Sequence, residues 1–153
     1  MPNVWILRPA HEEDATWMAD LRAVVLRADL ERLGRYDERR VRTRFLDAYA
    51  PGHTQVIVVD GRDSGLVAVR PEGESLWIEH FYLDPSVQGR GIGGGVLTGI
   101  LRDHADDDRM LRLNVLQGSA ARRLYERHGF VLESEDAVDV FLRREPGAQG
   151  PRP

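Results

Sequence analysis

The sequence predicts a mixed α/β (α+β) domain in which helices flank a mostly antiparallel central sheet. Three observations lead to this expectation. The chain has 153 residues, a length that suits one compact domain. Apolar residues make up 42% and charged residues 30% of the chain, as in folded globular proteins. Segments with a two-residue apolar period outnumber helical ones, and short turns join many of them, which favours antiparallel pairing.

The first third of the chain predicts a strand and then two helices. Residues 4–8 alternate and are apolar, and Pro9 is expected to end this strand. An acidic start at residues 11–14 precedes apolar side chains at helical spacing, and residues 36–49 have a similar period. The expected inward residues of the first helix are Trp17, Met18, Leu21, Val24, Val25 and Leu26.

The middle third predicts three strands and a helix. The strands are expected at residues 55–60, 64–70 and 75–83, with a hairpin turn at residues 61–63. A glycine-rich turn then leads into an apolar-periodic helix over residues 91–105.

The last third predicts a strand at residues 110–116, a helix at 119–128 and two strands at 130–133 and 138–143. Gly129 is expected to stop the helix. Its expected inward residues are Ala120, Ala121, Leu124 and Tyr125. The element order is therefore β-α-α-β-β-β-α-β-α-β-β, in one domain of residues 1–145. The tail at residues 146–153 is rich in proline and glycine, and we expect it to be disordered.

Composition excludes several classes of function. The chain has no cysteine, so it has no disulfide, thiolate metal site or cysteine nucleophile. Its net charge is −4 with both signs interleaved, which argues against nucleic-acid binding. The five histidines form no helical metal-binding pair, so no metal is expected. The longest apolar runs are far shorter than the ~18 residues of a membrane span, and no secretory signal is recognisable. We expect a cytoplasmic protein with no membrane partner.

The turn before the third helix is the most informative segment. It has the sequence Gln88-Gly89-Arg90-Gly91-Ile92-Gly93. Glycines let consecutive backbone N–H groups face one concavity, and the start of the helix adds its positive dipole end, so the turn is suited to a diphosphate. The plain alternative is a tight connection without a ligand.

Two other nucleotide motifs fit this turn poorly. Gly89, Gly91 and Gly94 satisfy a G-x-G-x-x-G dinucleotide fingerprint. However, the acidic residue that this motif needs ~20 positions later is missing, and too little chain remains for a doubly wound domain. A P-loop needs a lysine, and the chain contains none. A dinucleotide-binding oxidoreductase is therefore disfavoured.

Two sequence blocks carry a family resemblance. The Q-x-x-G-x-G pattern of residues 88–93 resembles the acyl-CoA signature of the GNAT superfamily of N-acetyltransferases. Residues 121–130, ARRLYERHGF, resemble the A-x-x-x-Y-E-x-x-G-F segment of the same superfamily. Gly118 and Ser119 stand where many members carry an asparagine near the cofactor arm. The element order resembles the GNAT fold over residues 4–144. The resemblance implies acetyl-CoA as the cofactor and an amine as the acceptor.

The resemblance also implies which residues bind the cofactor. The turn would hold the diphosphate, and the backbone N–H groups of Phe81 and Leu83 would bind the acetyl carbonyl and the cofactor arm. Asn114 or the Ser119 hydroxyl would replace the missing asparagine. The expected cofactor-binding residues are thus Phe81, Leu83, Gln88, Gly89, Arg90, Gly91, Ile92, Gly93, Asn114 and Ser119. Phe81 and Leu83 can also be plain core residues, because this chemistry uses their backbone.

Tyr125 is the candidate general acid. A phenol, with a pKa of ~10, is protonated at neutral pH and can protonate a departing thiolate whose acid has a pKa of ~8.5. The alternative is a core tyrosine at helical spacing beside Leu124.

Glu79 is the candidate general base, because strand alternation places it on the same face as Trp77 and Phe81. A carboxylate in apolar surroundings binds a proton more tightly, which suits a base. His80 is expected on the opposite face, and a water-mediated route is the other alternative.

Together these features predict an enzyme that moves an acetyl group from acetyl-CoA to a primary amine by direct attack in a ternary complex. The alternative is a non-catalytic acyl-CoA-binding module of the same fold, and the presence of Tyr125 favours the enzyme. The acceptor is expected to be a small-molecule or peptide amine. Edge strands near the C-terminus make a homodimer an open expectation.

Overall fold

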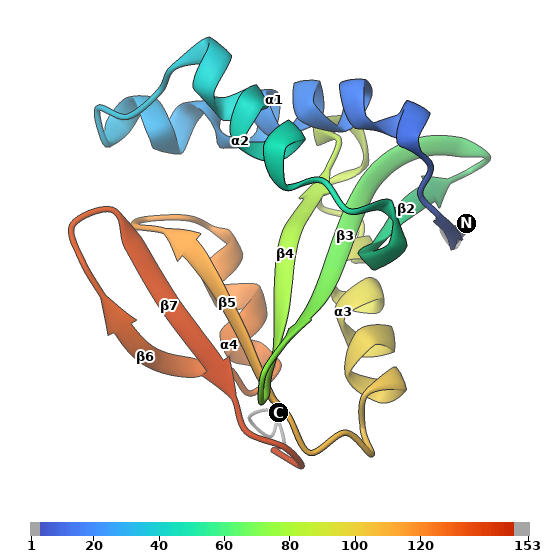
Figure 1. The fold of residues 1–153 in the computed structure, drawn as a ribbon, viewed down its shortest axis with the longest axis vertical. Coiled ribbons are helices and arrows are strands. Elements are labelled where there is room, and N and C mark those ends of the chain that lie inside the picture. Colours follow the sequence, from blue (N-terminus) through green and yellow to red (C-terminus); the bar gives the residue numbers. More distant parts are fainter. Residues whose placement is uncertain (1–3, 149–153) are drawn as a thin grey trace. The chain divides into compact units, whose positions relative to one another are not determined.

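The computed structural model describes residues 4–148, and its helices and strands follow in the predicted order (Figure 1). The strands are β1 (Trp5–Pro9), β2 (Thr54–Val59), β3 (Arg62–Glu72), β4 (Ser75–Leu83), β5 (Met110–Leu116), β6 (Val131–Glu135) and β7 (Asp139–Arg144). The α-helices are α1 (Ala15–Arg32), α2 (Glu38–Ala48), α3 (Ile92–Asp103) and α4 (Ala121–Arg127). Short 3-10 turns are η1 (Glu12–Asp14), η2 (Pro51–His53) and η3 (Pro85–Val87).

The strands hydrogen-bond in the order β1-β2-β3-β4-β5-β7-β6. β4 and β5 are parallel and pair at residues 75–77 and 110–112. The pairs β1–β2, β2–β3, β5–β7 and β6–β7 are antiparallel. The predicted mixed, mostly antiparallel sheet is therefore confirmed.

Contacts divide the chain into two compact units. The first contains the residues up to 69 and residues 80–92, and the second contains residues 70–79 and those from 93 onward. The expectation of one domain over residues 1–145 stays a prediction. Of the expected disordered tail, residues 149–153 lie outside the described residues. At residues 145–148 the chain turns, and the N–H of Ala148 donates to the carbonyl of Glu145.

The core of the first unit lies between α1, α2 and the start of the sheet. Its buried members are Ala10, Met18, Ala19, Leu21, Phe45, Val56 and Leu66. Val24, predicted to face inward, is instead 57% exposed. It lies about 120° around the helix from Met18, and small Ala23 takes the inward place nearby.

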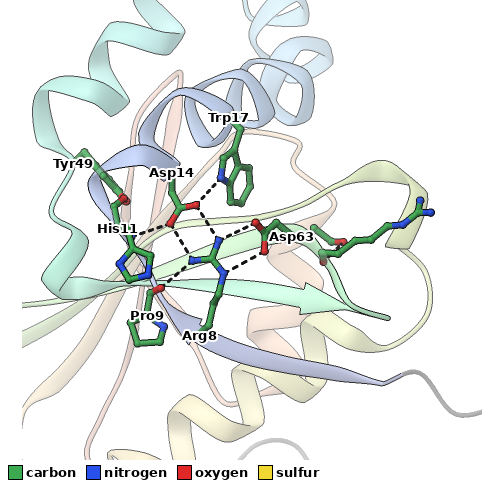
Figure 2. Close-up of polar contacts among 9 residues, drawn as sticks. Arg8, Pro9, His11, Asp14, Trp17, Tyr49 and Asp63 are labelled. Atoms are coloured by element: carbon green, nitrogen blue, oxygen red, sulfur yellow. Dashed lines mark hydrogen bonds and ion pairs between the residues drawn. The ribbon is translucent and has the colours of Figure 1, made fainter.

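An ion-pair network fixes the N-terminal end of this unit (Figure 2). Arg8 on β1 donates to both carboxylate oxygens of Asp14, at 3.1 and 2.9 Å, and to both of Asp63 on β3, at 3.2 and 2.8 Å. Asp14 also accepts from the indole N–H of Trp17 at 2.9 Å. The Arg8 hydrogen bonds are the main reason that the pKa of Asp14 lies well below its usual value. The start of α1 is thereby tied to two strands.

The second unit packs α3 and α4 with β5, β6 and β7. Its largest fully buried side chains are Leu76, Leu97, Leu113, Phe130 and Leu142. The expectation that Ala120 and Ala121 face inward is wrong, because both are exposed. α4 begins only at Ala121 and spans two turns, so its inward side consists of half-buried Leu124 and buried Tyr125.

One turn prediction is also corrected. Arg62 and Asp63 belong to β3 rather than to the hairpin turn. The turn lies at Asp60 and Gly61, whose φ values of +50° and +81° are the pair that a two-residue hairpin requires. β1 ends at Pro9 as predicted, and Pro9 pairs there with Gln55.

Candidate functional site

The glycine-rich turn between β4 and α3 has an open backbone. Gly89 and Gly91 have φ values of +77° and +80°, in the left-handed region that favours glycine. A Cβ added to either residue would meet no atom within 4 Å. α3 begins at Ile92, immediately after the turn. Bare backbone beside a helix N-terminus suits the phosphates of a nucleotide cofactor.

Side chains of the turn hold it against the end of β4. The Gln88 amide donates to the carbonyl of Leu83 at 2.9 Å, and the Arg90 guanidinium donates to the carbonyl of Ser86 at 3.2 Å. The Asp84 carboxylate accepts from both the backbone N–H and the hydroxyl of Ser86. Of the predicted cofactor residues, Leu83 and Gln88 are thus in direct contact.

Ile92 belongs to the core. The residue is 1% exposed, so its side chain is not available to a ligand, and a role of its backbone in cofactor binding stays a prediction. Arg90, in contrast, is exposed, and its guanidinium lies 3.8 Å from the Asp60 carboxylate.

The end of β4 is irregular at His80. This residue has φ +48°, an uncommon and strained conformation for a side chain with a Cβ. The His80 ring packs edge-on against the Phe45 ring, with 4.9 Å between the ring centres. Nδ1 of His80 lies 3.3 Å from the Tyr82 hydroxyl. Phe81 and Leu83 are half-buried. Regular alternation, on which the relative placement of Glu79 and His80 was predicted, therefore does not extend through this point.

Glu79, in the second unit, is ion-paired. Its Oε1 accepts hydrogen bonds from Nε and Nη2 of Arg70 on β3, at 3.0 and 2.8 Å. The expectation of a carboxylate among aromatic side chains did not include this partner. The second oxygen, Oε2, has no hydrogen-bond partner within residues 4–148, and the side chain is 28% exposed. Oε2 is thus the oxygen that can meet a water or a substrate proton.

Tyr125 is positioned by the end of α4. The N–H of Phe130 donates to the carbonyl of Tyr125, and that of Gly129 donates to the carbonyl of Glu126, which is the Schellman arrangement. Gly129 stops the helix as predicted. Tyr125 is 6% exposed, and its ring meets the Phe130 ring edge-on, with 5.7 Å between the ring centres. The Gly-Phe pair of the second sequence block therefore holds this tyrosine in place.

The two predicted replacements for the missing asparagine have protein partners. The Asn114 amide donates to the Asp139 carboxylate at 3.0 Å, and the Ser119 hydroxyl accepts from the backbone N–H of Ala121 at 3.2 Å. Gly93, the second residue of α3, is half-buried.

Sequence reasoning missed two arginines that contact these residues. One is Arg70, the partner of Glu79. The other is Arg22 on α1, whose Nε donates to the Tyr82 hydroxyl at 3.2 Å. Because β3 and β4 are neighbouring strands, a contact between Arg70 and Glu79 could have been considered from the sequence. No pattern in the sequence links α1 to Tyr82. Within residues 4–148 no group of three His, Asp or Glu side chains suits a metal ion.

Several solved structures with a similar fold are acetyltransferases. The PaiA N-acetyltransferase of Thermoplasma acidophilum, in complex with coenzyme A, matches with a TM-score of 0.74 at 16% identity, over 93% of this chain and 99% of that one. The ribosomal-protein-S18-alanine N-acetyltransferase of Escherichia coli matches with a TM-score of 0.68 at 14% identity, over 96% and 97%. An N-acetyltransferase of Staphylococcus aureus matches with a TM-score of 0.69 at 18% identity, over 90% and 99%. The fold is thus that of the GNAT acetyltransferases.

The family follows from the sequence profile of the acetyltransferase (GNAT) domain, which matches residues 50–132, more than half of the chain. The chain belongs to the GNAT acetyltransferase family. No curated protein sequence gives a significant match. No helix within residues 4–148 is long and apolar enough to cross a membrane.

Proposed function

We propose that this protein is an N-acetyltransferase that moves an acetyl group from acetyl-CoA to a primary amine. The glycine-rich turn carries the proposal. Its left-handed glycines, Gly89 and Gly91, have open space beside them and lead directly into α3. In a chain of the GNAT family, this geometry fits the diphosphate of coenzyme A.

The cofactor supplies an activated acetyl thioester, and the chain must bind it, orient it and move protons. The backbone N–H groups of residues 88–93 are proposed to bind the diphosphate, and those of Phe81 and Leu83 to bind the acetyl carbonyl and the cofactor arm. The Gln88–Leu83 hydrogen bond supports a fixed spacing between these two parts. Asn114 and Ser119 are proposed further along the arm.

Proton transfer is assigned to two side chains. Tyr125 is proposed to protonate the leaving thiolate, which its rigid setting between α4 and Phe130 supports. Glu79 is proposed to take the ammonium proton through Oε2, directly or through a water, while His80 stays the alternative base.

Cytoplasmic location and a homodimer stay predictions. β6 ends the strand order, and its Val131 and Leu132 are 52% and 44% exposed, which supports an interface there.

The proposed function is tested by two measurements on the whole protein. Calorimetry should detect binding of acetyl-CoA, and a thiol-release assay with a panel of primary amines should detect turnover. Binding without turnover on any amine would favour the non-catalytic acyl-CoA-binding module. Absence of binding would contradict both functions.

A further inference from the structure

Arg22 on α1 is a half-buried cation that has no carboxylate partner within residues 4–148. Its Nε donates to the Tyr82 hydroxyl at 3.2 Å, and its Nη1 donates to the carbonyl of Val41 on α2. In the described part of the chain, every other half-buried arginine except Arg144 has a carboxylate oxygen within 4.0 Å. Arg144 instead donates to the carbonyls of His128 and Ala148.

The guanidinium of Arg22 has unused donors. An arginine carries five N–H groups. Two of those on Arg22 are taken by Tyr82 and Val41, and the others have no acceptor within residues 4–148. Nη2 is not enclosed by protein, since the one buried side-chain nitrogen or oxygen without a partner in those residues is Nε of Arg143. Nη2 of Arg22 is therefore in contact with solvent, from which an anion can approach.

This cation lies beside the strand end that is proposed to hold the acetyl group. The Tyr82 hydroxyl bridges Arg22 and His80, with 3.2 Å to Nε and 3.3 Å to Nδ1. His80 and Tyr82 flank Phe81 on β4, so all of these groups belong to the first unit. The strained φ of +48° at His80 occurs in the same cluster, and such strain is concentrated at functional sites.

We propose that Arg22 binds a carboxylate of the acceptor, so that the acceptor is an amino acid or a similar amine with a carboxylate group. The proposal rests on the proposed acetyl transfer and adds its substrate class. The N–H groups of Arg22 without a partner within residues 4–148 lie on Nη2 and Nη1, and a guanidinium N–H forms a strong, charge-assisted hydrogen bond with a carboxylate oxygen. Because the Arg22 side chain is half-buried, its attraction to a carboxylate is stronger than it would be in bulk water.

The test uses pairs of amines that differ by one acidic group, each in the thiol-release assay. The pairs are phenylalanine with 2-phenylethylamine, leucine with 3-methylbutylamine, 4-aminobutyrate with propylamine, and O-phosphoethanolamine with ethanolamine. The wild-type protein should prefer at least one carboxylate-bearing member by roughly 10- to 100-fold in kcat/KM, the range of a charged hydrogen bond.

Variants assign the preference to Arg22. Arg22→Gln should raise KM for the carboxylate substrate and abolish most of the preference, while the affinity for acetyl-CoA and the rate with the uncharged partner stay unchanged. Arg22→Lys keeps the charge and should retain part of the preference. Arg27→Gln, on the same helix but exposed and paired with Glu31, is the matched control and should change neither value.

The outcomes separate this inference from the function on which it rests. Equal turnover of both members of every pair, or a preference only for the phosphate, would overturn the carboxylate site and leave acetyl transfer intact. An equal loss with both members in Arg22→Gln would assign Arg22 to structure and overturn the inference too. Failure to bind acetyl-CoA would refute the proposed function itself. The wild-type comparison tests the substrate class even where a variant does not fold, and Arg22→Lys then tests the role of Arg22 if Arg22→Gln is unstable.

Discussion

Tyr125 combines a buried ring with the hydroxyl that is proposed as the general acid. Because the ring packs on Phe130, Tyr125→Phe keeps this packing and removes only the hydroxyl. We expect kcat with the best acceptor of the panel to fall by roughly 10- to 1,000-fold, the contribution of a general acid, with little change in acetyl-CoA affinity. Steady-state kinetics and calorimetry measure the two quantities.

The control for this change is Tyr36→Phe. Tyr36 is half-buried beneath the Arg27 guanidinium, which lies 5.0 Å from the ring centre, and it belongs to no part of the candidate site. The same loss of one hydroxyl should leave kcat within about twofold. An unchanged kcat in Tyr125→Phe as well would make Tyr125 a core residue only.

The two carboxylates on Arg70 offer a test of the general base. Glu79 and Glu72 both pair with this guanidinium, at 2.8 and 2.7 Å, but only Glu79 lies next to the strand end at His80 and Phe81. Glu79→Gln should lower kcat by roughly 100-fold or more, as the loss of a general base does.

Glu72→Gln is the matched variant, because it removes the other ion pair of Arg70. Glu72 is 62% exposed, so this loss should leave kcat nearly unchanged. Similar losses in both variants would assign Glu79 to holding Arg70. A loss confined to His80→Gln would transfer the role of base to His80.

Single residues were predictable where a local motif defines them. Tyr125 and Gly129 share one short block, and the structure places both in one helix end. Arg22 was not predictable, since its partner Tyr82 lies 60 positions away and meets it only in the folded chain. The Arg70–Glu79 pair was missed for a similar reason, because alternation gives the face of a side chain but not its partner.

At the scale of elements, the turn between β4 and α3 should be sensitive to any side chain at its glycines. Gly91→Ala must adopt φ near +80° with a Cβ, which costs roughly 1–2 kcal/mol of stability. The Cβ would also enter the open space proposed for the diphosphate. We expect the acetyl-CoA affinity to fall at least 10-fold by calorimetry, well beyond the effect on folding.

Gly73→Ala controls for the backbone strain alone. Gly73 lies in the turn between β3 and β4, with φ +57° and likewise nothing within 4 Å of an added Cβ. Gly73→Ala should lower the melting temperature about as much as Gly91→Ala does, and should leave the acetyl-CoA affinity unchanged. If both variants bind acetyl-CoA as the wild-type protein does, the turn is a connection and not a cofactor site.

Elements differ in how well their ends could be predicted. The bounds of β4 and β5 agree with the sequence pattern, because turn residues or polar residues flank both apolar runs. α1 extends to Arg32, beyond its predicted apolar face, since charged residues with local ion pairs continue the helix. Ala120 was assigned to a helix face, but it is the exposed residue that precedes α4, which begins at Ala121.

For the whole molecule, the order of elements and the antiparallel bias were predictable because they depend on apolar period and turn length. The candidate residues were predictable only as separate segments. Phe81 and Gln88 belong to the first compact unit and Tyr125 to the second. Composition and spacing do not predict which of these segments contact one another.

The kinetic order follows from the whole chain and not from one site. The chain contains no cysteine, the side chain best suited to accept an acetyl group from a thioester. The Ser64 hydroxyl donates to the carbonyl of Arg62, and the Ser119 hydroxyl accepts from Ala121, so neither has a side-chain base that would activate it. Direct attack by the amine is then the simplest route, and both substrates must be bound together.

Initial rates should be measured against the acetyl-CoA concentration at several fixed acceptor concentrations. We expect the double-reciprocal plots to give intersecting lines. The enzyme would gain its rate from orienting two bound reactants and polarising the carbonyl, not from a covalent relay. Mass spectrometry after incubation with acetyl-CoA alone should find the protein unmodified. Parallel lines together with an acetylated protein would contradict direct transfer, and the modified residue would then identify the nucleophile that the sequence did not reveal.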